Sequence, residues 1–210
     1  MLEYELIKSK INDNSPLIIF IHGFGANRYD LLGLGQLFPN YHILSLEAPY
    51  KMGFGQSYWY DIQWIGNDKI INKEQAKKTK EILKEFIQND LDKLEISFSK
   101  DDISLFGFSQ GGILSYAVAS ELDMIKQIFC ISSYYDEDIA NVSDLNRNDL
   151  SIFACHGKSD EVIPYSQAVK SQDKINTYNL KKYKFITHEE GHWIPQIIIE
   201  EILNWNNDRN

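Results

Sequence analysis

The stretch Ile103-Ser104-Leu105-Phe106-Gly107-Phe108-Ser109-Gln110-Gly111-Gly112 decides the fold of this chain. It begins as a short apolar strand, carries the pattern G-x-S-x-G, and runs into a segment suited to a helix. Such a strand-to-helix turn holds a serine in a tight conformation with its hydroxyl exposed. The two outer glycines of the pattern let strand and helix cross closely, because a side chain there would collide. We therefore predict that Ser109 is a nucleophile and that the Gln110 N–H, at the helix start, faces developing negative charge.

Composition restricts the class of protein. At 210 residues the chain is long enough for a proper core, and we expect one domain over residues 1–210. The net charge of −9 argues against nucleic acid or an anionic membrane as the main partner. The N-terminus lacks a signal-peptide pattern, and no run of 18 apolar residues predicts a membrane span. Cys130 and Cys155 fall in apolar runs, which indicates buried free thiols and a reducing, cytoplasmic location. Oligomeric state stays open.

Apolar, β-branched runs alternate along the chain with longer amphipathic segments. This alternation predicts an α/β fold with a mostly parallel central sheet, helices on both faces, and no large separate lid domain. Expected strands are 4–8, 17–21, 42–46, 103–106, 127–131, 151–155 and 182–186, and expected helices are 28–37, 73–91, 110–122, 164–175 and 195–206. Residues 47–70 show neither the alternation of a strand nor the 3.6-residue period of a helix. Their Gly, Tyr and Trp content predicts a structured loop over a site, with Tyr58 and Trp59 contacting an apolar substrate group or simply packing on the sheet.

Polar residues that directly follow strands are the candidates for chemistry, since sites in parallel sheets collect at the carboxyl ends of strands. The strand 17–21 ends in His22-Gly23-Phe24-Gly25, where a sharp turn can present the Phe24 N–H to the serine as a second oxyanion donor. We expect His22 itself to bond the loop rather than act as a base. Likewise, His42 precedes a strand and is expected to be structural.

Two further strand ends supply a carboxylate and a histidine. Asp160 follows the strand 151–155 and can orient a histidine, with Asp136 and Asp138 as the fallback acids. The segment after the strand 182–186 offers two histidines, His188 and His192. Position favours His192, which lies between a glycine and a proline-containing helix start, although spacing alone leaves His188 as an alternative.

Together these segments resemble the small carboxylesterase, acyl-protein thioesterase and lysophospholipase group of α/β-hydrolases. The matching motifs are Gly-Phe-Ser-Gln-Gly-Gly at 107–112, His-Gly-Phe-Gly at 22–25, His-Gly-x-x-Asp-x-x-Ile-Pro at 156–164, Gly-His-x-Ile-Pro at 191–195, and Ala-Pro at 48–49 followed by an aromatic-Asp motif at 57–61. The resemblance spans roughly residues 17–205. It implies Ser109 as nucleophile, His192 as base and Asp160 as orienting acid, in the Ser…Asp…His order of that superfamily. It also assigns the base to His192 over His188.

The resemblance implies hydrolysis of short- to medium-chain carboxylic esters through an acyl-enzyme, with Phe24 and Gln110 as oxyanion donors. Tyr58, Trp59 and Trp193 are the expected substrate contacts, and neither a metal nor another cofactor is implied. The cluster Tyr58-Trp59-Tyr60 replaces a residue that is usually small in the group, so acyl-chain length is left open. Alternatives are a lysophospholipase or acyl-protein thioesterase acting on long chains, a haloperoxidase or C–C hydrolase with the same triad, and a non-catalytic ligand-binding protein.

Overall fold

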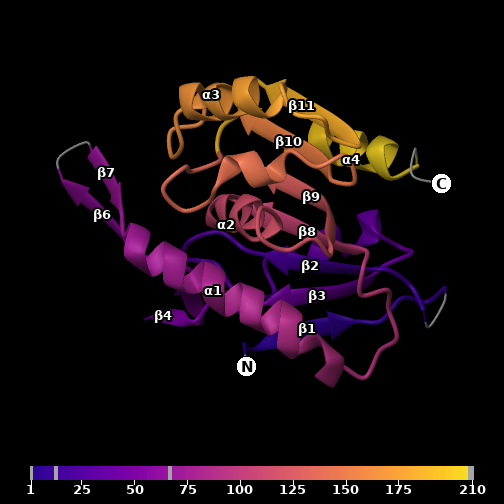
Figure 1. The fold of residues 1–210 in the computed structure, drawn as a ribbon. Helices are drawn as coiled ribbons and strands as arrows, with labels where there is room; N and C mark the ends of the chain where they lie inside the picture. The colour runs from indigo at the N-terminus through magenta and orange to yellow at the C-terminus, as the bar shows by residue number, and fades with distance from the viewer. Residues whose placement is uncertain (1, 12–13, 66–67, 208–210) are drawn as a thin grey trace.

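A seven-stranded sheet forms the centre of the computed structural model, which describes residues 2–11, 14–65 and 68–207 (Figure 1). Its strands lie in the order β1-β3-β2-β8-β9-β10-β11. β1 pairs antiparallel with β3, and the remaining neighbours are parallel. The strands are β1 Tyr4–Ile7, β2 Leu17–Ile21, β3 His42–Leu46, β8 Ile103–Phe108, β9 Ile125–Ile131, β10 Ser151–Gly157 and β11 Lys182–His188. The predicted mostly parallel sheet is confirmed.

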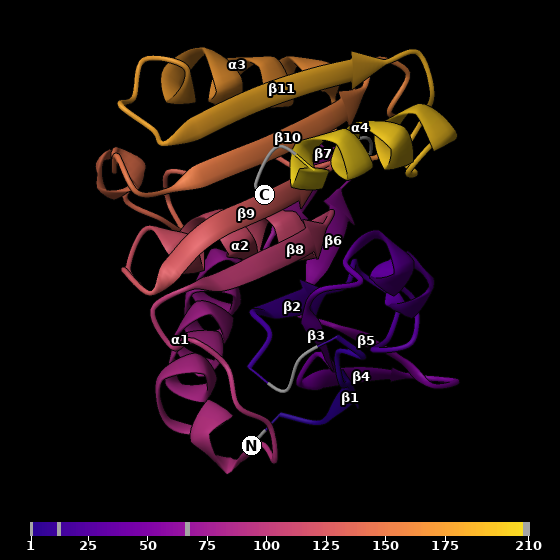
Figure 2. The same cartoon turned by 90° about the vertical axis from the view of Figure 1, so that its right-hand side faces the viewer.

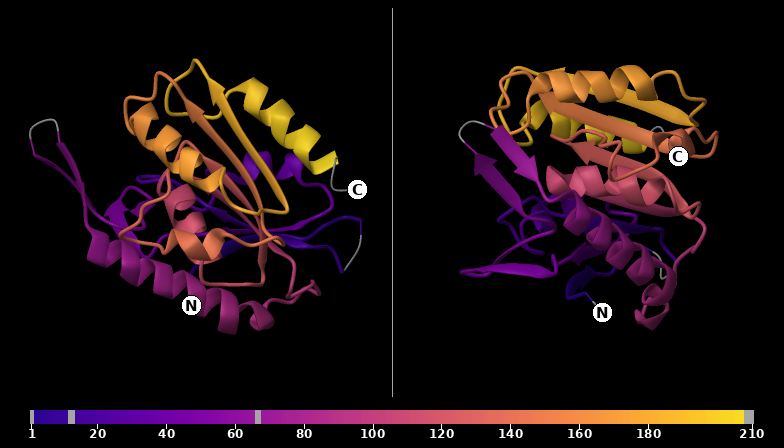
Figure 3. Two further views of the ribbon diagram at one scale, coloured as in Figure 1. Left: turned by 45° about the horizontal axis from the view of Figure 1, so that its top comes forward. Right: turned by 60° about the vertical axis from the view of Figure 1, so that its left-hand side comes forward.

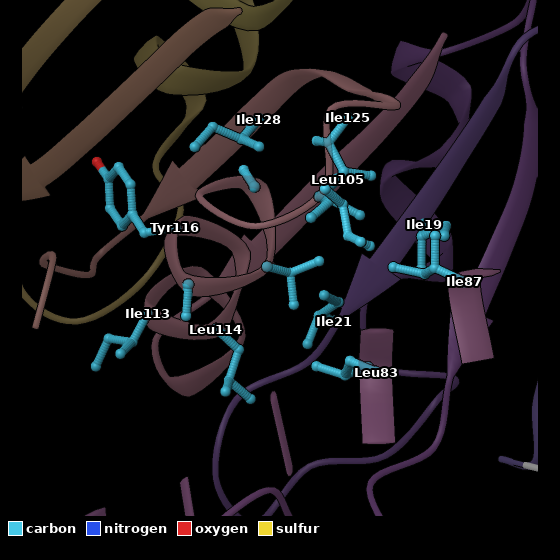
Figure 4. Close-up of a cluster of buried hydrophobic side chains, with 14 of the residues drawn as sticks. Ile19, Ile21, Leu83, Ile87, Leu105, Ile113, Leu114, Tyr116, Ile125 and Ile128 are labelled. Atoms are coloured by element: carbon cyan, nitrogen blue, oxygen red, sulfur yellow. The ribbon is translucent and has the colours of Figure 1, made fainter. Parts of the chain in front are cut away.

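Helices cover both faces of the sheet, as predicted (Figures 1 and 2). On one face pack α1 (Lys73–Asn89), α2 (Gln110–Ala119) and α3 (Tyr165–Ile175), which share a core cluster with side chains of the central strands. Figure 4 shows part of this cluster, with side chains of α1 and α2 beside those of the strands. On the other face packs α4 (Gln196–Asn207), with a second cluster that contains Phe20, Phe106 and Phe153. None of the helices in the described ranges is long and apolar enough to cross a membrane.

The helix predicted over 28–37 is wrong. The segment instead forms turns followed by the 3-10 helix η1 (Leu32–Leu37). Its sequence Leu-Gly-Leu-Gly carries two glycines, each of which costs about 1 kcal/mol of α-helix propensity relative to alanine. Gly35 also packs tightly beneath Ile43, where an added Cβ would lie 2.7 Å from the Cδ1 atom of that residue. Tertiary packing and backbone preference therefore both disfavour a regular helix here.

Residues 47–70, predicted to be a loop, contain two short β-hairpins. The first pairs β4 (Tyr50–Gly53) with β5 (Gln56–Tyr58), and the second pairs β6 (Ile62–Ile65) with β7 (Asp68–Ile71). The second hairpin projects from the body of the protein at the N-terminal end of α1 (Figures 1 and 3). Asn72 then caps α1 by accepting a hydrogen bond from the Gln75 N–H. Short helices η2 (Leu91–Lys93) and η3 (Val142–Leu145) complete the described elements.

The crossing of β8 and α2 has no room for side chains at its glycines. A Cβ added to Gly111 would lie 1.8 Å from the Ile21 carbonyl oxygen, and one added to Gly107 would lie 2.2 Å from the Gly111 carbonyl oxygen. Both obstructions are backbone atoms, which cannot rotate away as a side chain can. The spacing between β2, β8 and α2 therefore depends on these two glycines.

We predict that Gly111→Ala lowers the free energy of unfolding by about 3 kcal/mol or more, because helix and strand must separate. The matched control is Gly33→Ala, since an added Cβ at Gly33 would have no atom within 4 Å. That control should change the free energy by no more than about 1 kcal/mol. Urea unfolding followed by circular dichroism measures both, and equal stabilities of the two variants would contradict the prediction.

Candidate active site

Ser109 lies at the junction between β8 and α2 with an unusual backbone conformation. Its φ of 53° and ψ of −115° place it in a region that L-residues rarely adopt. The surrounding structure holds it there, because its N–H donates to the Ile131 carbonyl at 2.9 Å and its own carbonyl accepts from Gly112 and Ile113. The serine is largely buried, 6% exposed, yet borders an open cleft.

Three side chains from different strand ends meet at this junction. His192 Nε2 lies 2.9 Å from Ser109 Oγ, and His192 Nδ1 lies 2.6 Å from Asp160 Oδ2. A carboxylate only accepts, so it fixes the proton on Nδ1 and leaves Nε2 to accept the serine proton. The three residues predicted as a catalytic set are therefore brought together in hydrogen-bonding geometry.

Asp160 is held as a carboxylate in the protein interior. Burial alone would raise the pKa of this group, but hydrogen bonds from His192 and from the Ile163 and Val162 N–H groups outweigh burial and lower its pKa. Both backbone bonds reach Oδ1 at 2.8 Å. One oxygen thus anchors the loop while the other orients His192, which suits a group that stabilises an imidazolium.

The two expected oxyanion donors border the same site. Gln110 begins α2, so its N–H belongs to the unpaired first turn of a helix. Phe24 lines the cleft beside Ser109, and an added Cβ on the preceding Gly23 would lie 3.4 Å from Ser109 Cβ. In the described part of the chain, neither N–H donates to a protein acceptor. Both are therefore free to bind a substrate oxygen.

The cleft beside Ser109 has a volume of about 500 Å3. Its walls combine apolar side chains with the loop that follows β2, and the lining residues are Gly23, Phe24, Gly25, Ala26, Asp30, Ile62, Phe108, Ser109, Val162 and His192. Asp30, Ile62 and Val162 were not anticipated. Ile62 lies in a hairpin strand, and Asp30 lies in a turn, so neither position carries a sequence signal for this role.

The aromatic residues expected to contact substrate occupy different environments. Trp59 is completely buried, and its indole donates to the His22 carbonyl at 2.8 Å, so it supports the loop and does not line the cleft. Tyr58 lies between Tyr50 and Phe24, with its ring 5.5 Å from each of theirs. Trp193 is 52% exposed and packs over Gly191. Substrate contacts by Tyr58 and Trp193 stay predictions.

The alternative acids and bases lie elsewhere. Asp138 pairs with Lys73, and the Asp136 carboxylate lies 3.5 Å from the Tyr134 hydroxyl. His188 is buried, and neither ring nitrogen has a hydrogen-bond partner among the described residues. His42 accepts from the Ser9 N–H at 3.1 Å. Within the described ranges, no three His, Cys, Asp or Glu side chains cluster so that they could hold a metal ion.

Comparison with known proteins places this geometry in a family context. A model of the Phospholipase/Carboxylesterase family matches residues 2–207. An acyl-protein thioesterase 1 from Cryptococcus neoformans is 25% identical over 177 residues, which cover 76% of this chain and 72% of that protein. The fold resembles the Bacillus cereus carboxylesterase, with a TM-score of 0.83, 18% identity, and coverage of 100% and 95%. It also resembles Zea mays acyl-protein thioesterase 2, with a TM-score of 0.72, 16% identity, and 99% coverage of each chain.

Three buried histidines near the site should make stability depend on pH. Burial lowers the pKa of His22, His156 and His188 below the ordinary value of 6.5. As pH falls below 6.5, the unfolded chain therefore binds protons that the folded protein does not. The free energy of unfolding should fall between pH 7.5 and 5.5, by up to about 1.4 kcal/mol for each histidine.

Urea unfolding at the two pH values measures this dependence. In His188→Gln, the loss of unfolding free energy between pH 7.5 and 5.5 should be smaller by up to about 1.4 kcal/mol, since the variant has one histidine fewer to protonate. Stability that is unchanged or higher at pH 5.5 would contradict the prediction.

Proposed function

Because the chain belongs to the phospholipase/carboxylesterase family, we propose that it is a serine hydrolase that cleaves carboxylic esters with short to medium acyl chains. The observation that carries this proposal is the continuous path from Ser109 Oγ through His192 to Asp160, with separations of 2.9 and 2.6 Å. Such a path activates a hydroxyl that is otherwise a weak nucleophile at neutral pH.

The chemistry would proceed in two halves. His192 Nε2 takes the Ser109 proton while Oγ attacks the ester carbonyl carbon, and the resulting oxyanion is bound by the Phe24 and Gln110 N–H groups. Collapse of this intermediate leaves an acyl group on Ser109, and His192 returns the proton to the departing alcohol. Water, activated by the same histidine, then attacks the acyl-enzyme and releases the acid. Asp160 stays ionised throughout and balances the imidazolium charge.

A second candidate substrate class is a long-chain acyl thioester or lysophospholipid. It is supported by the acyl-protein thioesterase from Cryptococcus neoformans, which is similar over most of this chain. The same attack and the same oxyanion donors would serve a thioester, whose leaving group is a thiol. Acyl-chain length therefore separates the two candidates better than the chemistry does.

Hydrolysis of p-nitrophenyl esters from C2 to C16 tests the proposed function. The native protein should turn these esters over, and Ser109→Ala should lower kcat by about 10⁴-fold or more. The optimum chain length decides between the two substrate classes. Ser115→Ala is the matched control, since this buried α2 serine donates only to the Gly111 carbonyl. It should keep activity within about three-fold. Absence of turnover of every ester would refute the proposal.

The cleft should also discriminate by charge. Asp30 is the only Asp, Glu, Lys or Arg among the described residues that line the cleft. A negative charge on the substrate, about 8 Å from the Asp30 carboxylate, would weaken binding by about 1 kcal/mol. This corresponds to a kcat/KM about five-fold lower. We therefore expect p-nitrophenyl butyrate to be preferred over the anionic mono-p-nitrophenyl succinate. Asp30→Asn and added salt should each reduce the ratio of kcat/KM for the butyrate ester to kcat/KM for the succinate ester. A preference for the succinate ester would contradict this expectation.

A further inference from the structure

A buried polar cluster lies directly behind the oxyanion loop, which we define as residues 22–26, and the proposed reaction does not use it. His22, Glu47 and Ser57 are each at most 4% exposed, and the indole of Trp59 adjoins them. Glu47 directly follows β3, so it stands at the same edge of the sheet as the candidate active site. Burying a polar group costs free energy unless the group is well hydrogen-bonded, so a buried cluster of this kind calls for an explanation.

The hydrogen bonds of His22 determine its tautomer. Nδ1 lies 2.7 Å from the Gly23 carbonyl oxygen, which can only accept, so the ring proton must reside on Nδ1. Nε2 accepts the Ala48 N–H at 3.2 Å, which also requires an unprotonated nitrogen. Burial lowers the pKa of His22, so the ring stays neutral with this single proton. His22 is thus a fixed donor to the Gly23 carbonyl.

That carbonyl belongs to the same peptide unit as the Phe24 N–H. The peptide is planar and trans, so its C=O and N–H point in opposite directions. We propose that His22 is a positioning residue, which orients the Gly23–Phe24 peptide through its Nδ1–H and so directs the Phe24 N–H at the substrate oxygen. A bond to the carbonyl also polarises the amide and strengthens its N–H as a donor. This role rests on the proposed serine-hydrolase function.

The other peptides of the oxyanion loop are held by different partners. The His22 carbonyl accepts from the Trp59 indole at 2.8 Å. Ser57 pairs with the far end of the loop, accepting from the Gly25 N–H at 2.9 Å and donating its own N–H to the Ala26 carbonyl at 2.8 Å. The Gly23–Phe24 peptide lies between these clamps. Its carbonyl accepts a long bond from the Ala26 N–H at 3.4 Å and the shorter, 2.7 Å bond from the His22 side chain.

Glu47 keeps this arrangement from shifting to another hydrogen-bond pattern. Its Oε1 accepts the Ser57 hydroxyl proton at 2.8 Å, which leaves the longer 3.3 Å contact between Ser57 Oγ and His22 Nε2 without a proton. Burial would raise the pKa of Glu47, but the Arg28 N–H, Ser57 and Lys51 bonds outweigh burial and lower the pKa. An ionised Glu47 therefore draws the Ser57 proton away from His22, and Nε2 remains the acceptor for Ala48.

Reciprocal substitutions at His22 separate positioning from plain packing. In His22→Asn the amide NH₂ can take the place of Nδ1–H, whereas in His22→Gln the side-chain oxygen can take the place of Nε2. The readouts are ester turnover and the rate at which a fluorophosphonate modifies Ser109, followed by intact mass. In the second reaction Ser109 Oγ bonds to phosphorus, fluoride leaves, His192 takes the proton, and the phosphoryl oxygen occupies the oxyanion position.

We expect His22→Gln to lower kcat and the phosphonylation rate by about 10- to 100-fold, somewhat less than complete loss of an oxyanion donor, with KM changed by less than about three-fold. His22→Asn should keep both rates within about five-fold of the native values. The control is His42→Gln, a substitution at a buried histidine of β3 outside the site, which should lower thermal stability without lowering either rate.

Equal losses in both His22 variants, or a loss in kcat without a matching loss in phosphonylation, would overturn the positioning role. Native protein that reacts with the fluorophosphonate but hydrolyses no ester would refute only the proposed substrate class. The phosphonylation rates of the two His22 variants would then still test the positioning role. Native protein that does neither would refute the serine-hydrolase function and the positioning role together.

Discussion

The close crossing of β8 and α2 is the constraint on which the rest of the structure depends. Every residue of α2 is buried, so the helix is held from all sides by β2, β8, β9 and α1. This packing keeps Ser109 at φ 53°, a conformation that costs on the order of 1–3 kcal/mol in isolation. The strained turn lifts the serine hydroxyl out of the sheet edge. The same helix start supplies the Gln110 N–H, so the close packing of α2 positions both the proposed nucleophile and one proposed oxyanion donor.

Those parts of the fold that follow from burial could be predicted from the sequence. Continuous apolar runs mark strands buried on both faces, and β2 and β3 begin and end where the pattern places them. Because strands of a parallel sheet end at one edge, polar residues just past them were expected to meet there, and Ser109, Asp160 and His192 do so. Hydrophobic patterning joined to topology limits the acid to residues that directly follow strands, and the resemblance of residues 156–164 to a family motif then favours Asp160 over Asp136.

The parts that depend on tertiary contacts of irregular backbone could not be predicted. Residues 47–70 contain two short hairpins, and the strands of the first, β4 and β5, are too short and too exposed to show alternation. We expect Trp59 at the cleft because aromatic residues in a loop often line sites, yet hydrogen bonds to Gln110, His22 and Thr79 hold it in the core. Its indole reaches His22 and its backbone N–H reaches the Gln110 side chain at 3.1 Å. Neither partner is near in sequence, so no local pattern encodes the contact.

The irregular segment nevertheless bears on the chemistry as directly as the regular one. The Gln110 side chain binds the backbone of residues 59 and 60, at 3.1 and 2.7 Å, while its backbone N–H is the proposed oxyanion donor. Trp59 in turn bonds the oxyanion loop. The two proposed oxyanion donors, which come from separate strand ends, are therefore linked through one buried tryptophan. A preorganised pair of donors stabilises charge only if their spacing is fixed. In the proposed mechanism, the bonds of Trp59 and Tyr60 to Gln110 and His22 would contribute to that fixed spacing.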